Sequence, residues 1–324
     1  MKTKSFLLGA AALMLATACS NDEVVKVAEN SAAIGFNSFV NNSTRADYGS
    51  DAKPENLNVY GVSTNAEINP FIVFNGDVVT NTGSAWTYSP LRYWISGNDY
   101  TFAAVAPAGV ATVEQGNGTN AGGIETITFT NTGDIDLLYA EAAATGVAAD
   151  NPNVEFTMGH MLSRVRFQFD NGMHSNYSIK VSDVHITNVL TEGTINKAKA
   201  ETVWTATEDK TADFEFAMAD EYTASSKYAR SAHKYVIPTG KYAYNAIFTI
   251  ELYDNGTGAI VKTFKHTDVT LPELDYTAGL SYTLKANIND TNIDPEEELE
   301  PIVFDVVKVN DWAEYIENEV PGFE

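Results

Sequence analysis

Acidic residues two positions apart are the first candidates for chemistry in this chain: Asp134 with Asp136, and Asp213 with Glu215. On a strand this spacing places both carboxylates on one face, and glycoside hydrolysis uses a pair of carboxyl groups. The chain carries 43 acidic residues against 20 lysines and arginines, a formal net charge of −23. Acidic pairs in such a chain belong mostly to solvated faces, so we predict no catalytic residues and no enzyme. The negative charge also argues against nucleic acid as a partner.

Histidines and short motifs give no signal for a metal or cofactor. The five histidines are scattered along the chain at positions 160, 174, 185, 233 and 266. The patterns H-E-x-x-H, C-x-x-C, G-x-S-x-G, G-x-G-x-x-G and the P-loop do not occur in the sequence. We therefore predict neither a metal site nor a cofactor.

An aromatic cluster between residues 86 and 94 has a more open interpretation. Trp86, Tyr93 and Trp94 could form a platform on which sugar rings stack. Large aromatic residues at alternating positions of a strand also pack commonly into the core of a β-sandwich. Both interpretations stand at this point, with core packing favoured.

The single cysteine, Cys19, follows an apolar run that begins after Lys2 and Lys4. A basic start, about a dozen apolar residues and small residues before the cysteine are typical of a secretory signal, and the run is too short to span a bilayer. We interpret residues 1–18 as a lipoprotein signal peptide and Cys19 as the acylated residue. Ala16 stands where such signals usually have leucine, so a secreted protein that loses Cys19 is the alternative. Without a second cysteine no disulfide can form within the chain, and each domain needs its own core.

The elements that must position any site are strands. Segments rich in Val, Ile, Thr, Tyr and Phe alternate with period two, and Asn-Gly and similar turn signals separate them. This pattern predicts antiparallel β-sandwich structure, with only the alanine-rich residues 141–147 as a possible helix. A polar break near residue 150 divides the chain into an N-terminal domain of residues 46–152 and a C-terminal domain of residues 153–290. An acidic, extended linker and a last strand follow in residues 291–324.

Several motifs, taken in order, resemble those of the Bacteroidales fimbrillin family, the FimA/Mfa-like type V pilins that are exported as lipoproteins. In the N-terminal domain the motifs are a tryptophan-rich stretch, the "Y-x-F-x-A-x-x-P" segment that follows it and a "DLLYA" strand. In the C-terminal part they are an "H-x-L-S-x-V-x-F" strand, an "IP-x-G" turn and a near-terminal V-x-x-W. These lie at residues 86–94, 100–107, 136–140, 160–167, 235–240 and 309–312. The resemblance implies two transthyretin-like, Greek-key β-sandwich domains in tandem. Asp22 and Glu23 also resemble the signal that sends such lipoproteins to the outer face of the outer membrane.

The same resemblance implies a route of assembly. An arginine-specific protease would cut between Arg45 and Ala46 and release the propeptide of residues 19–45, whose strand includes Ile34, Phe36 and Phe39. A strand of the next subunit would then fill the empty groove. The donor residues would come from the C-terminal region: Ile302, Phe304, Val306, and either Lys308 or Trp312.

The partners implied are other pilin subunits, in a homopolymer or with anchor and tip pilins, the protease, a surface receptor and the outer membrane through the lipid anchor. The expected place is the fimbrium at the cell surface, and the expected role is adhesion and biofilm formation. The residues after Trp312 are acidic and interrupted by Pro321, which makes a poor apolar donor. A tip or minor subunit that does not polymerise, or a surface glycan-binding lipoprotein, therefore remains the alternative.

Overall fold

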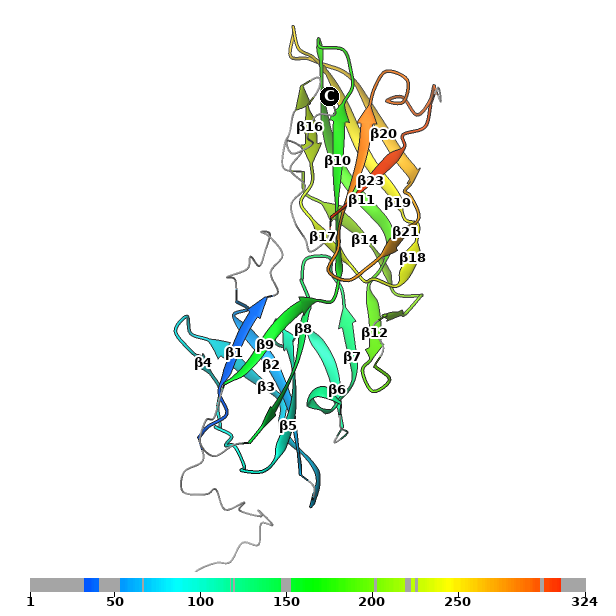
Figure 1. The fold of residues 1–324 in the computed structure, drawn as a ribbon. Helices are drawn as coiled ribbons and strands as arrows, with labels where there is room; N and C mark the ends of the chain where they lie inside the picture. Colours follow the sequence, from blue (N-terminus) through cyan, green and yellow to red (C-terminus); the bar gives the residue numbers. More distant parts are fainter. Residues whose placement is uncertain are drawn as a thin grey trace, which may run out of the picture.

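The computed structural model of the protein describes residues 32–40, 53–65, 67–116, 118, 120–146, 153–200, 203–218, 223–224, 227–297 and 300–309. Within these ranges the secondary structure is strand, apart from one turn of 3-10 helix at Ala121–Gly123. The prediction of an all-β fold built from antiparallel sheets is confirmed. No helix in the described ranges is long and apolar enough to cross a membrane. Figure 1 shows an elongated molecule with the N-terminal strands in its lower half and the C-terminal strands in its upper half.

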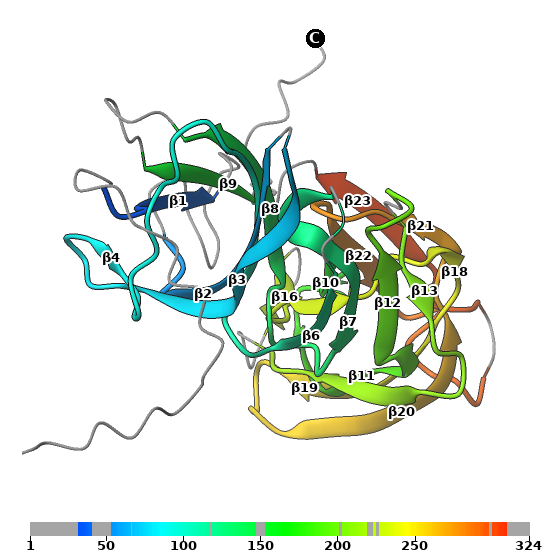
Figure 2. The same ribbon diagram turned by 90° about the horizontal axis from the view of Figure 1, so that it is seen from below.

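The N-terminal unit is built on a seven-stranded sheet. Its order is β1 (Phe36–Val40), β9 (Val154–His160), β8 (Leu138–Thr145), β5 (Asp99–Ala106), β2 (Asn56–Asn65), β3 (Ile68–Asn81) and β4 (Trp86–Thr87). All neighbours are antiparallel except β1 and β9, which run parallel. The sheet curls, so that β1 and β4 at its two ends approach each other (Figure 2).

A four-stranded sheet completes the N-terminal unit, in the order β13 (Thr205–Ala206), β12 (Glu192–Asn196), β7 (Ile124–Thr130) and β6 (Ala111–Gln115). Apolar residues from both sheets, such as Tyr60 and Val105 from the first and Ile127 and Phe129 from the second, share one core. A second core, on the other face of the seven-stranded sheet, contains Phe74, Phe102 and Phe156.

The C-terminal unit places two larger sheets face to face. One has the order β16 (Tyr228–Arg230), β10 (Ser163–Asn171), β22 (Ser281–Ile288) and β23 (Phe304–Val309), and β17 (Lys234–Val236) also pairs with β10. The other has the order β14 (Thr211–Phe216), β11 (Tyr177–Leu190), β19 (Asn245–Asp254) and β20 (Ile260–Thr270), and β15 (Thr223–Ala224) also pairs with β11. A two-stranded sheet of β18 (Gly240–Tyr242) and β21 (Leu274–Tyr276) accompanies them. The inner faces meet in an aromatic core that includes Phe167, Phe169 and Phe248.

Strand pairing crosses the boundary predicted at residues 152–153. Strand β9 pairs with β1 and β8, β12 pairs with β7, and β13 pairs with β12, so three strands that follow the polar break belong to the N-terminal unit. Strand β10 also pairs in parallel with β22, which the turn signals did not indicate. The transthyretin-like Greek-key layout stays a prediction.

Two local predictions were wrong. Residues 141–145 belong to β8 rather than to a helix, because they pair with β5 residues 99–103 and tertiary pairing overrides the helix preference of alanine. The acidic segment after β22 is not a free linker, because Ile293 lies buried in the core and Asp294 pairs with Lys262 of β20. We call residues 289–303 the crossover, since they connect β22 to β23 while contacting the opposite sheet.

Candidate functional site

The described N-terminal segment, residues 32–40, forms backbone hydrogen bonds on both of its flanks. On one side the Ile34 amide donates to the Arg92 carbonyl at 2.8 Å, and the Trp94 amide donates to the Ala32 carbonyl at 3.1 Å. On the other side β1 pairs in parallel with β9, from Phe36 opposite Val154 onward. The segment therefore joins the two ends of the curled sheet. We call the space it occupies, between residues 92–94 and β9, the slot.

Alternate side chains of this segment point into the core. Ile34 is 0% exposed and Phe36 is 2% exposed, and Ser38 is also buried. The Phe36 ring contacts four other rings, with centroids 5.2 Å from Phe74, 5.5 Å from Tyr88, 6.1 Å from Phe102 and 5.9 Å from Phe156. Burying an Ile or Phe side chain contributes about 1.5–3 kcal/mol, so the core depends on what fills the slot.

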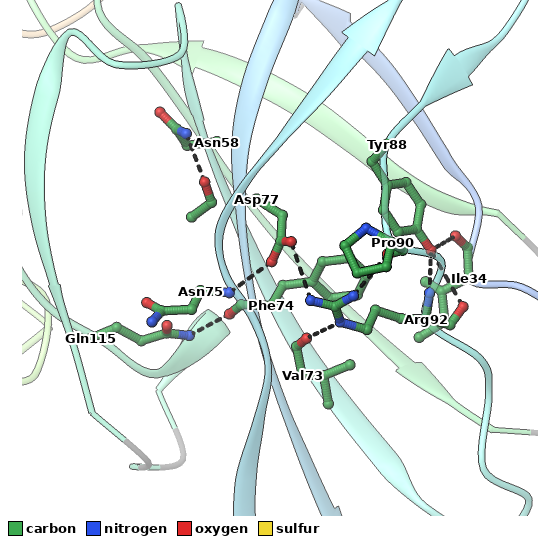
Figure 3. Close-up of polar contacts among 11 residues, drawn as sticks. Ile34, Asn58, Val73, Phe74, Asn75, Asp77, Tyr88, Pro90, Arg92 and Gln115 are labelled. Carbon is green, nitrogen blue, oxygen red and sulfur yellow. Dashed lines mark hydrogen bonds and ion pairs between the residues drawn. The ribbon is translucent and has the colours of Figure 1, made fainter. Parts of the chain in front are cut away.

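Tyr88 and Arg92 fix the rim of the slot (Figure 3). The Tyr88 hydroxyl donates to the Ile34 carbonyl at 2.7 Å and accepts from the Arg92 amide at 3.3 Å. The Arg92 guanidinium donates to the Val73 carbonyl at 3.1 Å and the Pro90 carbonyl at 2.7 Å, and it pairs with Asp77 at 3.3 Å. Burial raises the pKa of Tyr88, so its hydroxyl remains a donor at neutral pH. This rim is thus anchored to β3 independently of the segment that it holds.

The predicted donor residues lie in a comparable position in the C-terminal unit. Strand β23 pairs antiparallel with β22, from Ala286 opposite Phe304 to Ser281 opposite Val309. Ile302 and Phe304 are buried, and the Phe304 ring lies 5.5 Å from Phe167, 5.8 Å from Phe169 and 6.1 Å from Phe248. Val306 packs against the same core, whereas Lys308 is exposed. We call the place of β23 beside β22 the C-terminal groove, and β23 closes its own unit in this structure.

The two strands share a sequence pattern that alternation and turn signals did not indicate. Residues 34–37 read I-G-F-N and residues 302–305 read I-V-F-D. In both, the isoleucine and the phenylalanine are buried and the residue between them is more exposed. The repeat of I-x-F-[ND] is the signal in the sequence that relates the two strands.

The remaining sequence predictions have different outcomes. Cys19, Arg45, Ala46 and Trp312 lie outside the described residues, as does the side chain of Phe39. Trp94 is not part of a surface platform, because it is 3% exposed and its ring packs edge-on against Tyr100 at 4.9 Å. Trp86 packs against the same core, while Tyr93 is 40% exposed. Alternating aromatic residues here build the core, as the period-two pattern favoured.

The carboxylate pairs do not assemble a catalytic site. Asp136 is buried and lies 2.8 Å from His160 Nδ1, while the carboxylate of Asp134 is exposed and pairs with Lys234 at 2.7 Å. Asp213 and Glu215 are both exposed on β14. Within the described ranges, no three His, Cys, Asp or Glu residues converge closely enough to hold a metal ion.

Comparisons with known proteins find the same fold in solved structures of Bacteroides proteins. A fimbrial protein of Bacteroides vulgatus superposes with a TM-score of 0.62 at 15% identity, covering 86% of this chain and 99% of its own. A candidate cell adhesion protein of Bacteroides ovatus gives a TM-score of 0.52 at 18% identity, covering 88% and 99%. No curated protein matches the sequence.

The family comparison covers most of the chain. A family model described as fimbrillin-like matches residues 44–312. The two structural relatives named above carry fimbrial and adhesion descriptions, and neither is described as an enzyme. A fimbrial family implies a place at the cell surface and contacts with other pilin subunits. The match extends over far more than half of the sequence, and the chain belongs to the fimbrillin-like family.

Proposed function

We propose that this protein is a structural fimbrial subunit that is exported as a lipoprotein through Cys19, cleaved after Arg45, and polymerised by strand exchange into the slot. The observation that carries the proposal is the seat of residues 32–40. Their strand is hydrogen-bonded on both flanks, and it lies directly upstream of the proposed cleavage site. Arg45 follows β1 by five residues in the polar stretch N-N-S-T-R-A-D-Y-G-S. A stretch of this polar composition suits proteolysis, and the fimbrillin-like match begins at residue 44, after β1.

Removing the N-terminal segment would leave an unfavourable state. Backbone groups of β9 and residues 92–94 would lose their partners, and the rings around Phe36 would face an empty space. Unpaired strand edges recruit other strands, and an unmade buried hydrogen bond costs about 1–3 kcal/mol. A strand from another subunit would restore both the hydrogen bonds and the apolar contacts.

The C-terminal strand is the donor that fits this slot. Ile302 and Phe304 repeat the spacing of Ile34 and Phe36, and Asp305 stands where the first strand has Asn37. Leaving the C-terminal groove breaks pairing on one flank only, with β22, whereas entering the slot makes pairing on two. The exchange replaces one I-x-F burial by another and gains a second flank, which provides its driving force. Because each subunit accepts at one place and donates at another, the contact does not close and a filament results.

Assembly of this kind would support adhesion and biofilm formation at the outer surface, with the lipid anchor holding the precursor to the outer membrane. A tip or minor subunit that accepts without donating is the second candidate. The burial of β23 in its own core favours it, because donation requires that this core open.

Cleavage of the soluble chain from residue 20 onward tests the proposal. The protein is treated with an arginine-specific protease and run on a denaturing gel without boiling, with Arg45→Ala as the matched control. We expect a ladder of detergent-resistant multimers from the cleaved wild type alone. Clean cleavage after Arg45 that yields only monomer would reject the shaft role and leave the tip or minor subunit.

A further inference from the structure

Gly35, at the entrance of the slot, lies unusually close to the start of β9. A Cβ atom built on Gly35 would overlap Oδ1 of Asn153 and lie 2.9 Å from its Cγ. This approach is closer than van der Waals contact, so a larger residue at this position requires that Asn153 move. Asn153 directly precedes β9, and the Val154 amide donates to the Gly35 carbonyl at 2.8 Å. The native strand therefore fits because it has glycine at this one point of close approach.

The donor strand lacks that glycine. When Ile302 and Phe304 are aligned with Ile34 and Phe36, Val303 takes the place of Gly35. Val303 stands directly before β23 and is 67% exposed, so solvent surrounds most of its side chain. In the slot, a β-branched side chain would meet Asn153 in its present position. The donor therefore enters the slot only if the Asn153 side chain turns away or the start of β9 shifts.

The structure has room for that wall to move. Strand β8 extends to Thr145, but it pairs with β9 only at Leu138 with His160 and Tyr139 with Gly159. Beyond these pairs the two strands separate, and we call the gap between residues 140–145 and 153–158 the seam. A cavity of about 490 Å³ opens there, lined by Ala142, Ala143, Ala144, Thr145, Asn37, Asn153, Val154 and Glu155. Asn153 thus stands between the slot and the seam.

The edge of β8 along the seam is suited to receive β9. Its other edge pairs with β5 over the whole of Asp99 to Ala106, so β8 is held in place. Three of its residues that line the seam are the alanines 142–144, whose small side chains offer little steric resistance to an approaching strand. Continuing the register of the two existing pairs would bring Ala143 opposite Glu155.

We propose that Asn153 and the start of β9 form a movable wall of the slot. This wall contacts the residue at the Gly35 position and moves into the seam when a strand with a larger residue enters. The inference rests on the proposed strand exchange for its role in assembly. Asn153 is then a specificity-determining residue that distinguishes the chain's own first strand from the donor.

A peptide assay tests the reading of this position. The acceptor is the chain from residue 20 cleaved after Arg45, and the probe is a fluorescent peptide of residues 300–309. We expect the Val303→Gly peptide to bind roughly three- to tenfold more tightly than the wild-type peptide. This factor is the cost of displacing the Asn153 side chain from its rotamer, converted to affinity. A Val307→Gly peptide, which changes another outward residue, controls for loss of strand propensity and should show no gain. The Asn153→Gly acceptor should bind both the wild-type and Val303→Gly peptides equally.

A cysteine reporter tests the movement in the uncleaved chain, where strand exchange plays no part. The chain from residue 20 contains no cysteine, so Ala143→Cys with Glu155→Cys forms a disulfide only when the seam closes to strand distance. Adding Gly35→Val should increase cross-linking severalfold. Asp99→Cys with Thr145→Cys, already paired across β5 and β8, should cross-link equally with either residue at position 35 and reports that the fold is intact.

The outcomes separate the two proposals. Failure of every peptide to bind would reject strand exchange, while the reporter would still decide whether the wall moves. Equal binding of the wild-type and Val303→Gly peptides, or unchanged cross-linking with Gly35→Val, would reject the movable wall.

Discussion

Strands β1 and β23 bury the same I-x-F pattern but are held in different ways. The N-terminal segment is bonded on two flanks, by residues 92–94 and by β9, and the Phe36 ring meets four aromatic rings. Strand β23 is bonded on one flank, by β22, and the Phe304 ring meets three. The segment that the proposal removes is therefore the more firmly seated of the two.

This difference indicates how the direction of assembly is determined. An intact chain has both places filled, so nothing favours exchange. Once the N-terminal segment is lost, β23 of a neighbouring subunit can leave its C-terminal groove, where it pairs on one flank, and fill the empty slot, where it pairs on two. Proteolysis, rather than any intrinsic weakness of β1, then controls when subunits join.

Truncating the two phenylalanines gives the largest expected effect. In the uncleaved chain, Phe36→Ala and Phe304→Ala should each lower the free energy of unfolding by about 3–5 kcal/mol, because each leaves a cavity among aromatic rings. Urea unfolding of the uncleaved proteins measures this. After cleavage the two should diverge, since Phe36 leaves with its strand while Phe304 enters the slot of a neighbour.

The divergence is read from the temperature at which the multimer ladder dissociates. Multimers made from Phe36→Ala should be as stable as those of the wild type, and those of Phe304→Ala should dissociate at lower temperature. Weaker multimers from Phe36→Ala would mean that the first strand stays in place, which contradicts the exchange.

Tyr88→Phe should have a smaller effect, confined to the slot. It removes the hydrogen bond to the Ile34 carbonyl and should cost about 0.5–1.5 kcal/mol. We expect faster hydrogen exchange in residues 32–40 and no change at β23. Tyr276→Phe is the matched control, because its buried hydroxyl has no hydrogen-bond partner among the described residues of the C-terminal unit. Equal effects of the two variants would show that the Tyr88 bond does not hold the segment.

Alternation and turn chemistry made the strands predictable, and the family resemblance singled out Ile34, Phe36, Ile302 and Phe304 as residues that fill a core. Pairing over long sequence distances was not predictable, because no local signal relates Ile34 to Arg92 or β12 to β7. The alanines of residues 142–144 carry a helical preference that only their pairing with β5 overrides. The charge pattern of the crossover gave no indication that Ile293 would be buried in the core.

Lowering the pH should destabilise β23 but not β1, an effect smaller than those above. His266 on β20 stacks on Phe248 at 4.8 Å, and burial lowers its pKa despite the opposing effects of the Ile293 backbone and the Asp294 carboxylate. The unfolded chain thus binds the proton more readily, so stability is complete above the ordinary value of 6.5 and decreases as pH falls below it. Hydrogen exchange at pH 7 and pH 5 should show β23 opening more readily at pH 5 and residues 32–40 unchanged. His266→Gln should reduce this pH dependence. If the variant keeps the wild-type pH dependence, the effect belongs to another titrating group.

The smallest expected effect concerns the contact between the crossover and β20. The hydrogen bond from Lys262, followed by the Glu296 amide, holds the pKa of Asp294 below its ordinary value of 3.8. The pair therefore stabilises the fold above that pH and loses its effect as pH falls through the lowered pKa. Because the Lys262 side chain is exposed to solvent, which screens the pair, Asp294→Asn should change global stability little, yet it should speed hydrogen exchange in residues 289–297 and 304–309 at neutral pH. Asp290→Asn, whose carboxylate has only a 3.9 Å contact with His174, should leave both rates unchanged. If Asp294→Asn also raises the yield of multimers after cleavage, the crossover limits release of the donor; an unchanged yield would place the limit at the slot.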